Sequence, residues 1–123
     1  RDRTQTVQQY SYTPSSGNVV KIEEVWAIPS SVRPGEKVDL RATYAILHPD
    51  PDAKIGIVEI REIKHNGALV GRPEVKVVRT GGTYTSTVPI SLPKNAALGI
   101  YTVITTIDSG LAKDIKQTDF IVV

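Results

Sequence analysis

Apolar and polar residues alternate most regularly between residues 38 and 46. Every second residue there is apolar, namely Val38, Leu40, Ala42, Tyr44 and Ile46, and the positions between them are mostly polar. Successive side chains of a β-strand point to opposite faces of a sheet. This period of two therefore predicts an antiparallel strand with one face buried and the other exposed to water.

Extended segments of the same kind recur from residue 19 to the end of the chain. They cover residues 19–28, 55–65, 68–70, 75–79, 84–92 and 99–108, followed by a last strand that carries Phe120 and Val122. Pro34-Gly35 is typical of a type II turn, and Asn66-Gly67 is typical of a type I′ hairpin. About seven strands at this spacing, with no convincing helix, predict an all-β, immunoglobulin-like sandwich of two antiparallel sheets.

The segment 55–65 interrupts the alternation. Its apolar residues are Ile55 and Ile57, then Val58 and Ile60, and then Ile63. A regular strand cannot place all of these on one face. The sequence therefore predicts a β-bulge in this segment, and residue 56, a glycine, is the candidate position.

Charged residues crowd the same segment and its neighbour. They are Glu59, Arg61, Glu62, Lys64, Glu74, Lys76 and Arg79. Opposite charges on adjacent strands contribute about 0.2–1 kcal/mol per pair, and charges on an edge discourage pairing with other chains. We interpret these residues as a solvated sheet face, with a polar binding face as the functional alternative.

The stretch from Leu92-Pro93 to Gly99-Ile100-Tyr101 has the spacing of a corner between two strands of a sandwich. A tyrosine at such a corner folds back and bonds to the backbone just upstream. We therefore expect Tyr101 to be mostly buried, with its hydroxyl bonded to the backbone between Leu92 and Leu98. This motif determines fold and carries no chemistry.

Residues 1–18 are polar and rich in Gln, Ser and Thr, with Val7, Tyr10 and Tyr12 as the only sizeable apolar groups. Such a segment buries too little surface to offset the entropy of ordering it. We predict a flexible arm or linker over residues 1–18, with an edge strand over residues 7–12 as the alternative, and a sandwich over residues 19–123. The arm is expected to be dispensable for folding.

Composition narrows the class of protein further. The 123 residues are enough for one domain with a core of its own, and they include no cysteine, which excludes disulfides and thiolate chemistry. Fifteen basic and 13 acidic residues leave a net charge of +2, too balanced to indicate nucleic acid as a partner. No apolar run reaches the ~20 residues of a membrane-spanning helix. The chain has no methionine, even at position 1, so we expect it to be a piece of a longer product with any targeting segment upstream.

Candidate chemistry is sparse. The only histidines, His48 and His65, adjoin turns and are separated by a strand, and no serine lies in a nucleophile elbow, so we interpret both as solvated loop residues. The loop from His48 to Asp52 places His48, Asp50 and Asp52 two residues apart. These are too few ligands for Ca²⁺, so a proline-stiffened turn with Asp bonded to nearby backbone amides is the preferred interpretation, and metal binding is the alternative.

Two further features, an acidic pair and the single tryptophan, could mark a site. Glu23 and Glu24 are adjacent in sequence and so point to opposite faces of a strand, which argues against a glycosidase pair. Trp26 is the only tryptophan, and we expect it to be partly buried; a sugar-binding platform needs more exposed aromatic surface. No glycine-rich phosphate loop is present. The sequence thus predicts no catalytic, cofactor-binding or metal-binding residues.

Three motifs follow one another with sandwich spacing. They are residues 34–40 (Pro-Gly-Glu-Lys-Val-Asp-Leu), residues 82–93, which begin Gly-Thr-Tyr and end Leu-Pro, and residues 99–103 (Gly-Ile-Tyr-Thr-Val). In order and spacing they resemble bacterial immunoglobulin-like or fibronectin-type-III-like envelope domains. More narrowly, the chain resembles the C-terminal domain of bacterial glycine-zipper envelope proteins, although neither a glycine zipper nor a lipid-attachment cysteine occurs in it. The resemblance implies fold and compartment, and no catalytic residues.

These inferences combine into one functional hypothesis. The chain is expected to be a non-catalytic spacer and protein-interaction module of the cell envelope, located in the periplasm or at the cell surface. Its partners would be other envelope proteins or the rest of its own longer chain, with no nucleic acid, no cofactor and no direct membrane insertion. The alternatives are a carbohydrate- or peptidoglycan-binding accessory module and an accessory domain of a secreted enzyme.

Overall fold

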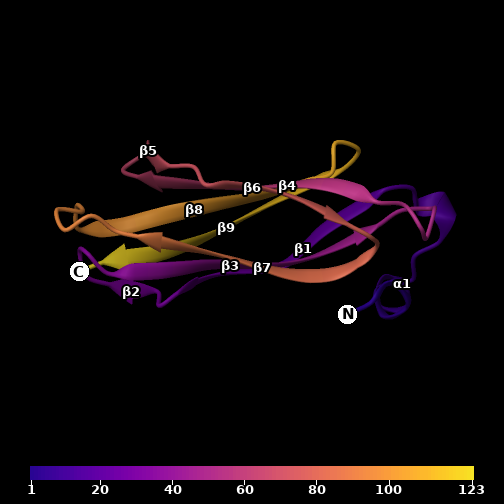
Figure 1. Cartoon of the computed structure of the whole chain (residues 1–123). Coiled ribbons are helices and arrows are strands. Elements are labelled where there is room, and N and C mark those ends of the chain that lie inside the picture. Colours follow the sequence, from indigo (N-terminus) through magenta and orange to yellow (C-terminus); the bar gives the residue numbers. More distant parts are fainter.

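The computed structural model describes residues 1–123 as two antiparallel sheets packed face to face (Figure 1). The three-stranded sheet has the order β1-β3-β7, with β1 (Val19–Ile28), β3 (Lys37–Leu47) and β7 (Gly82–Ser91). The six-stranded sheet has the order β2-β9-β8-β4-β5, and β6 also pairs with β4. Its strands are β2 (Ser31–Val32), β4 (Ile55–His65), β5 (Ala68–Gly71), β6 (Glu74–Arg79), β8 (Gly99–Asp108) and β9 (Lys113–Val122). The predicted all-β, immunoglobulin-like sandwich is confirmed, and β2 is the one strand that pairs in parallel.

Two clusters of apolar side chains fill the space between the sheets. The cluster near the β7–β8 corner contains Val38, Leu40, Tyr101, Val103 and Phe120, among others. The second cluster contains Ile22, Tyr44, Ile46, Ile57 and Ile107. The inward face predicted for β3 is confirmed, because all five of its alternating apolar residues are buried. Each fully buried side chain of this size contributes about 1.5–3 kcal/mol, so these clusters stabilise the sandwich.

The tyrosine corner is confirmed. Tyr101 is 5% exposed, and its hydroxyl donates to the backbone carbonyl of Ala97 over 2.7 Å. The ring stacks between His65, at 4.4 Å between centroids, and Phe120, at 5.1 Å. One side chain therefore fixes the path of the corner and closes one end of the core.

The predicted bulge at residue 56 is wrong. Strand β4 alternates without interruption, with Ile55, Ile57, Glu59, Arg61 and Ile63 buried and the residues between them more exposed. The apolar pattern slips in the sequence because two of the inward positions carry charges. No irregularity of register lies at residue 56; one lies between residues 22 and 24 of β1, and another lies within the segment 55–65, between residues 63 and 64 of β4 where they pair with β5.

Glu59 and Arg61 belong to a polar network inside the sandwich, so the interpretation as a solvated face is wrong for them. Both are 1% exposed. The Glu59 carboxylate accepts hydrogen bonds from the hydroxyl groups of Tyr44 and Ser86 in the opposite sheet, and each oxygen–oxygen distance is 2.5 Å. Arg61 donates to the Ser86 carbonyl over 3.1 Å, and Arg79 donates to the Tyr44 hydroxyl over 2.9 Å. The network thus joins β4 and β6 to β3 and β7.

Burial and the single carboxylate shape the ionisation of this network. Burial lowers the pKa of Arg61, and the nearby Glu59 carboxylate opposes that effect. Burial raises the pKa of Tyr44, and its hydrogen bond to Glu59 raises it further. Nε and Nη1 of Arg61 have no hydrogen-bond partner in the chain. The buried guanidinium group of Arg61 and the partly buried one of Arg79 therefore need the Glu59 carboxylate as their counter-charge, because an unpaired buried charge is costly.

The N-terminal residues form a helix, α1 (Arg3–Tyr10), and a 3₁₀ turn (Pro14–Ser16), so the edge-strand alternative and the expectation of no helix are wrong. Asp2 caps α1 by accepting from the Gln5 amide, and the Gln5 side chain accepts from the Asp2 amide in return. Short polar sequences with such a capping box can start a helix without an apolar stripe. Neither helical segment has the length and hydropathy that a membrane crossing requires.

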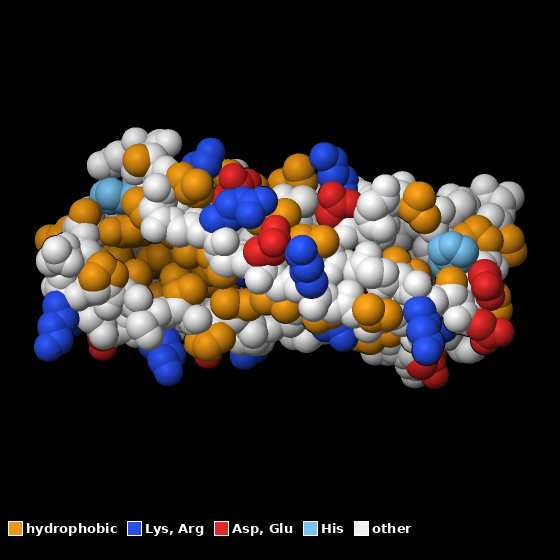
Figure 2. Space-filling view, turned by 45° about the horizontal axis from the view of Figure 1, so that its top comes forward, with side chains coloured by type: hydrophobic (Ala, Val, Ile, Leu, Met, Phe, Trp, Pro, Cys, Tyr) orange, Lys and Arg blue, Asp and Glu red, His pale blue; other side chains and the backbone are white.

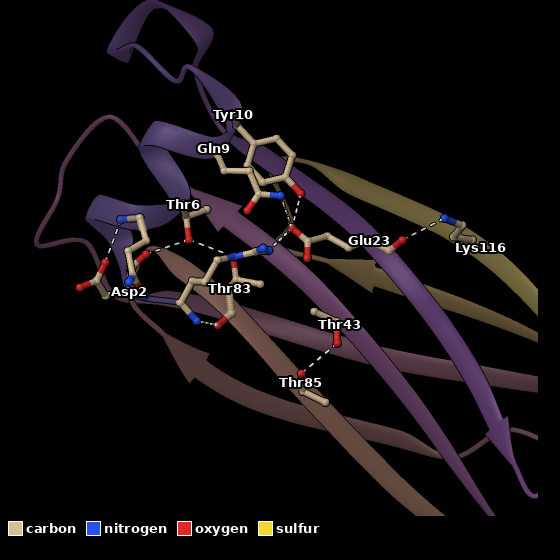
Figure 3. Close-up of polar contacts among 11 residues, drawn as sticks. Asp2, Thr6, Gln9, Tyr10, Glu23, Thr43, Thr83, Thr85 and Lys116 are labelled. Carbon is tan, nitrogen blue, oxygen red and sulfur yellow. Dashed lines mark hydrogen bonds and ion pairs between the residues drawn. The ribbon is translucent and has the colours of Figure 1, made fainter.

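Polar contacts hold α1 against the outer face of the three-stranded sheet (Figure 3). Thr6 is fully buried, and its hydroxyl lies 2.8 Å from that of Thr83. The Glu23 carboxylate bonds to Arg1, Gln9 and Tyr10. Burial alone would raise the pKa of Glu23, but the hydrogen bonds from Arg1 and Tyr10 outweigh it and leave this pKa below its usual range. The first residues of the chain are thus attached to the sandwich through a charged cluster.

Candidate functional site

A groove of about 460 Å³ opens beside the tyrosine corner, at the end of the sandwich opposite α1. Figure 2 shows it as a hollow in which hydrophobic side chains gather. The residues that line it come from β4, β5, β7, β8, the β5–β6 connection and the β7–β8 corner. They are Ile63, His65, Val70, Gly71, Pro73, Ile90, Ser91, Leu92, Pro93, Asn95, Ala96, Ala97 and Tyr101.

The groove exists because the six-stranded sheet is incomplete at this edge. Strand β5 pairs only with residues 63–65 of β4, and β6 pairs only with residues 55–60. Between them the chain turns through Arg72-Pro73, and the Pro73 carbonyl accepts from the Arg61 amide. Gly71, the ladder partner of Ile63, has no side chain to fill the space beside Ile63, and the core residues Ile63, Ile90, Leu92 and Tyr101 line the groove.

Exposed apolar side chains extend the groove outward. Val70 of β5 is 57% exposed and Leu98 of the corner is 64% exposed, and Leu69 is exposed as well. Single exposed apolar residues are common on proteins, but a contiguous patch that rims a groove marks an interaction site. The polar groups at the groove are few, and they include the His65 ring, the Ser91 hydroxyl and the Asn95 amide.

One wall of the groove is the open edge of the three-stranded sheet. The Leu92 amide donates to the Glu36 carbonyl on the β3 side over 2.9 Å. In an antiparallel ladder, residues alternate between facing the partner strand and facing away from it. Ser91, Pro89 and Thr87 therefore direct their backbone groups away from β3, where β7 has no neighbouring strand.

Basic residues predominate around this end of the sandwich. Lys37 is the ladder partner of Ser91, and Lys94 lies in the corner between two residues that line the groove. Arg33 begins the adjacent turn, in which Glu36 is the one acidic residue. Neither lysine forms an ion pair within the chain. The rim of the groove next to β7 therefore carries a net positive charge.

His65 belongs to this site, and the expectation that it is a solvated loop residue is wrong. Its ring stacks on Tyr101, and its Nδ1 lies 3.0 Å from the Ile100 carbonyl. His48 precedes β4, whereas His65 ends it, so the strand separates the two histidines. The sequence placed His65 beside a turn, and only the strand pairing of His65 with Tyr101 reveals the stack.

The loop from His48 to Asp52 is a hydrogen-bonded turn, as the preferred interpretation predicted. The Asp50 amide donates to Nδ1 of His48 over 2.9 Å, and the Asp52 amide donates to the Asp50 carboxylate over 2.9 Å. No group of three or more His, Cys, Asp or Glu side chains is arranged to hold a metal ion. The side chains of His48 and Asp50 thus accept hydrogen bonds within the turn itself.

Trp26 lies on the outer face of the three-stranded sheet and is partly exposed. It is the ladder partner of Arg41, whose neighbours Leu40 and Ala42 point into the core. Arg41 in turn donates to the Thr87 hydroxyl over 3.3 Å. The partial burial predicted for Trp26 is confirmed. Glu23 serves the α1 contact described above.

No protein-family model matches the sequence, and no curated relative matches it. Solved structures do share the fold. The CARDB domain of the PF1109 protein from Pyrococcus furiosus, solved in complex with di-metal ions, superposes with a TM-score of 0.57 at 14% identity, over 86% of this chain and 94% of that one. The sporulation control protein Spo0M from Bacillus subtilis gives 0.57 at 15% identity, over 84% of this chain and 49% of that one.

A β-glucosidase from Listeria innocua, solved in complex with glucose, contains a similar sandwich. Its TM-score is 0.55 at 16% identity, over 85% of this chain, which spans 16% of the glucosidase. At such identities the likeness concerns the fold alone. The chain is therefore an immunoglobulin-like sandwich similar to CARDB domains and to domains found within glycosidases.

Proposed function

We propose that this chain is a non-catalytic protein-interaction module of the cell envelope, located in the periplasm or at the cell surface, and that it binds a partner protein at the groove. The observation that supports this proposal is the apolar core reaching the surface between β5 and β7, where the exposed Val70 lines the groove and the exposed Leu98 follows the lining residue Ala97. Exposed apolar surface of this kind is an aggregation hazard unless another molecule covers it. A similar sandwich forms one part of a longer β-glucosidase chain, which agrees with a role as a module.

Site-specific photo-crosslinking tests the proposal. Val70 at the groove and Val78 on the outer face of β6 are both exposed valines of neighbouring strands, so they form a matched pair. A photo-reactive residue at position 70 should crosslink a defined protein in envelope fractions of the source cells, and the same residue at position 78 should not. Equal labelling from both positions, or none from position 70, would contradict the proposal.

Carbohydrate binding is a second candidate, and it rests on Trp26. The indole lies on the outer sheet face next to Arg41, which bonds to Thr87, and aromatic rings next to hydrogen-bonding side chains suit sugar recognition. Trp26 is the only tryptophan, so its fluorescence reports on this face alone. Titration with cell-wall fragments that changes the emission, and loses its effect in Trp26→Ala, would favour this function over binding at the groove.

A further inference from the structure

We infer that the groove receives an extended segment of a partner protein, which adds to the open edge of β7 as a further strand and places an acidic flank beside Lys37 and Lys94. This inference rests on the proposed function and specifies the partner's chemistry. In β-strand addition, main-chain hydrogen bonds hold the segment, and pockets for alternate side chains select it. The groove offers both kinds of contact.

The backbone of β7 supplies the hydrogen-bonding groups. Because Leu92 faces β3, the amide and carbonyl of Ser91 and of Thr87 face the open side of the strand, together with the carbonyl of Pro89. Unpaired donors and acceptors on an edge strand form a template for pairing with another chain. An incoming segment would find these groups along the wall of the groove.

The chain itself demonstrates pairing on this same edge. The Thr83 amide donates to the Arg1 carbonyl over 3.0 Å, and the Arg1 amino group donates to the Thr83 carbonyl over 3.4 Å. Residue 83 lies an even number of positions from residues 87 and 91, so all three face the open side. The N-terminal residue thus covers the first part of the edge, and the part beside the groove stays open.

The side chains around the groove match an alternating strand. Residues two apart in a strand point to the same side at a spacing of about 7 Å, so alternate side chains of the segment would enter the groove. There they would contact the apolar side chains of Ile63, Ile90 and Val70, which line the groove. Apolar side chains at these alternate positions are therefore favoured.

Charge specifies the flank of the segment. Three basic residues, Lys37, Lys94 and Arg33, outnumber the two acidic residues here, which are Glu36 and the Pro89 ladder partner Asp39. Complementary charge at the rim of an interface raises the association rate and fixes the register. Acidic residues next to the apolar positions of the segment would meet these basic side chains.

Pro89 argues against a second copy of this chain as the occupant. A proline within an edge strand removes one donor and is a common protection against continuous edge-to-edge pairing. A short segment needs only the groups on either side of Pro89, whereas two long β7 strands would meet the gap twice. A peptide segment of another protein is therefore the favoured occupant.

The test begins with a phage-displayed library of random peptides selected against the intact chain. An enriched family should alternate apolar residues and carry Asp or Glu on one flank. Fluorescence anisotropy of its labelled consensus peptide then compares Ser91→Pro, which lacks the outward amide, with Ser91→Ala, which keeps it. The proline variant should weaken binding about tenfold, the cost of one good hydrogen bond, and the alanine variant should leave it unchanged.

Two further measurements test strand addition even if Ser91→Pro misfolds. Methylation of the peptide's backbone nitrogens on the side that faces β7 should weaken binding to the unaltered chain, whereas methylation on the other side should not. Lys37→Glu together with Lys94→Glu should weaken binding, and added salt should weaken binding to the unaltered chain but not to this variant. Three outcomes would overturn strand addition. They are an enriched family with helical spacing, binding that ignores methylation, and a dimer in sedimentation that the consensus peptide dissociates.

Failure of strand addition can be distinguished from failure of the proposed function. A partner that crosslinks at residue 70 but whose binding ignores residue 91 would leave the groove as a protein site and remove the strand model. Absence of any crosslink at residue 70 would remove the proposed function, whatever peptides the library yields.

Discussion

Glu59 and Tyr101 are two buried side chains whose polar atoms bond within the chain, Glu59 across the two sheets and Tyr101 within its own corner. Glu59 accepts hydrogen bonds from Tyr44 and Ser86 across the two sheets. Tyr101 fixes the corner through Ala97 and forms part of the groove's floor. Both side chains are buried, so their polar atoms must find partners inside the protein.

Replacing the buried carboxylate should be costly. Glu59→Gln keeps the size of the side chain but leaves Arg61 and Arg79 without a counter-charge. Breaking a buried ion pair by removing one partner costs about 3 kcal/mol or more, so the free energy of unfolding in urea should fall by that amount. Glu62→Gln on the same strand, which points out of the core, should change it by less than about 0.5 kcal/mol. Equal effects would contradict the role assigned to the network.

The corner hydroxyl makes a smaller contribution. Tyr101→Phe keeps the ring between His65 and Phe120 but removes the hydrogen bond to the Ala97 carbonyl. The loss of one such bond should lower the free energy of unfolding by about 1 kcal/mol, measured by urea denaturation. Tyr101→Ala, which also empties the stack, should cost about 3–5 kcal/mol. An unchanged stability in Tyr101→Phe would show that the corner does not need its hydrogen bond.

At the scale of elements, local pattern predicted the strands whose inward positions are apolar, such as β3, and failed where an inward position is polar. Strand β4 looked irregular because Glu59 and Arg61 occupy the core, and their partners Tyr44 and Ser86 lie 15 and 27 residues from Glu59. Helix α1 has no apolar stripe that would predict it, and it is attached to the sheet through hydrogen bonds of Thr6 and Glu23 instead. Periodicity detects burial of apolar surface, and it cannot detect polar groups that satisfy one another over long distances.

The attachment of α1 should depend on pH through Glu23. The hydrogen bonds from Arg1 and Tyr10 hold the pKa of this carboxyl below its ordinary value in the folded chain, so ionised Glu23 stabilises the attachment. The contribution is present above the unfolded pKa and is lost as the pH falls through the folded pKa. Hydrogen exchange at the Thr6 amide should therefore be protected at neutral pH and lose protection in acid. Glu23→Gln should show weak protection at both, and protection that ignores pH would contradict this assignment.

At the scale of the whole molecule, the sequence predicted the two-sheet sandwich and the tyrosine corner but not the groove. The corner depends on local spacing, from Leu92 to Tyr101, which a sequence displays. The groove depends on where β5 ends and β6 begins along β4, and on β7 having a free side. These are properties of strand pairing, and the residues that line the groove come from four separate stretches of the chain, 63–65, 70–73, 90–97 and residue 101. No local pattern brings Val70, Ser91 and Ala97 together.

The boundary at residue 18 can be tested on the whole chain. Both core clusters consist entirely of residues beyond position 18, so a chain that starts at Val19 should still fold. It would lose the contacts of Thr6 and the buried Tyr12, and it would uncover Ala45 beneath α1. We expect circular dichroism to show an intact β-sandwich with a cooperative thermal transition and a stability lower by about 2 kcal/mol, the value of one buried side chain. An unfolded truncated chain would show that α1 is part of the domain, whereas an unchanged midpoint would show that its attachment is energetically neutral.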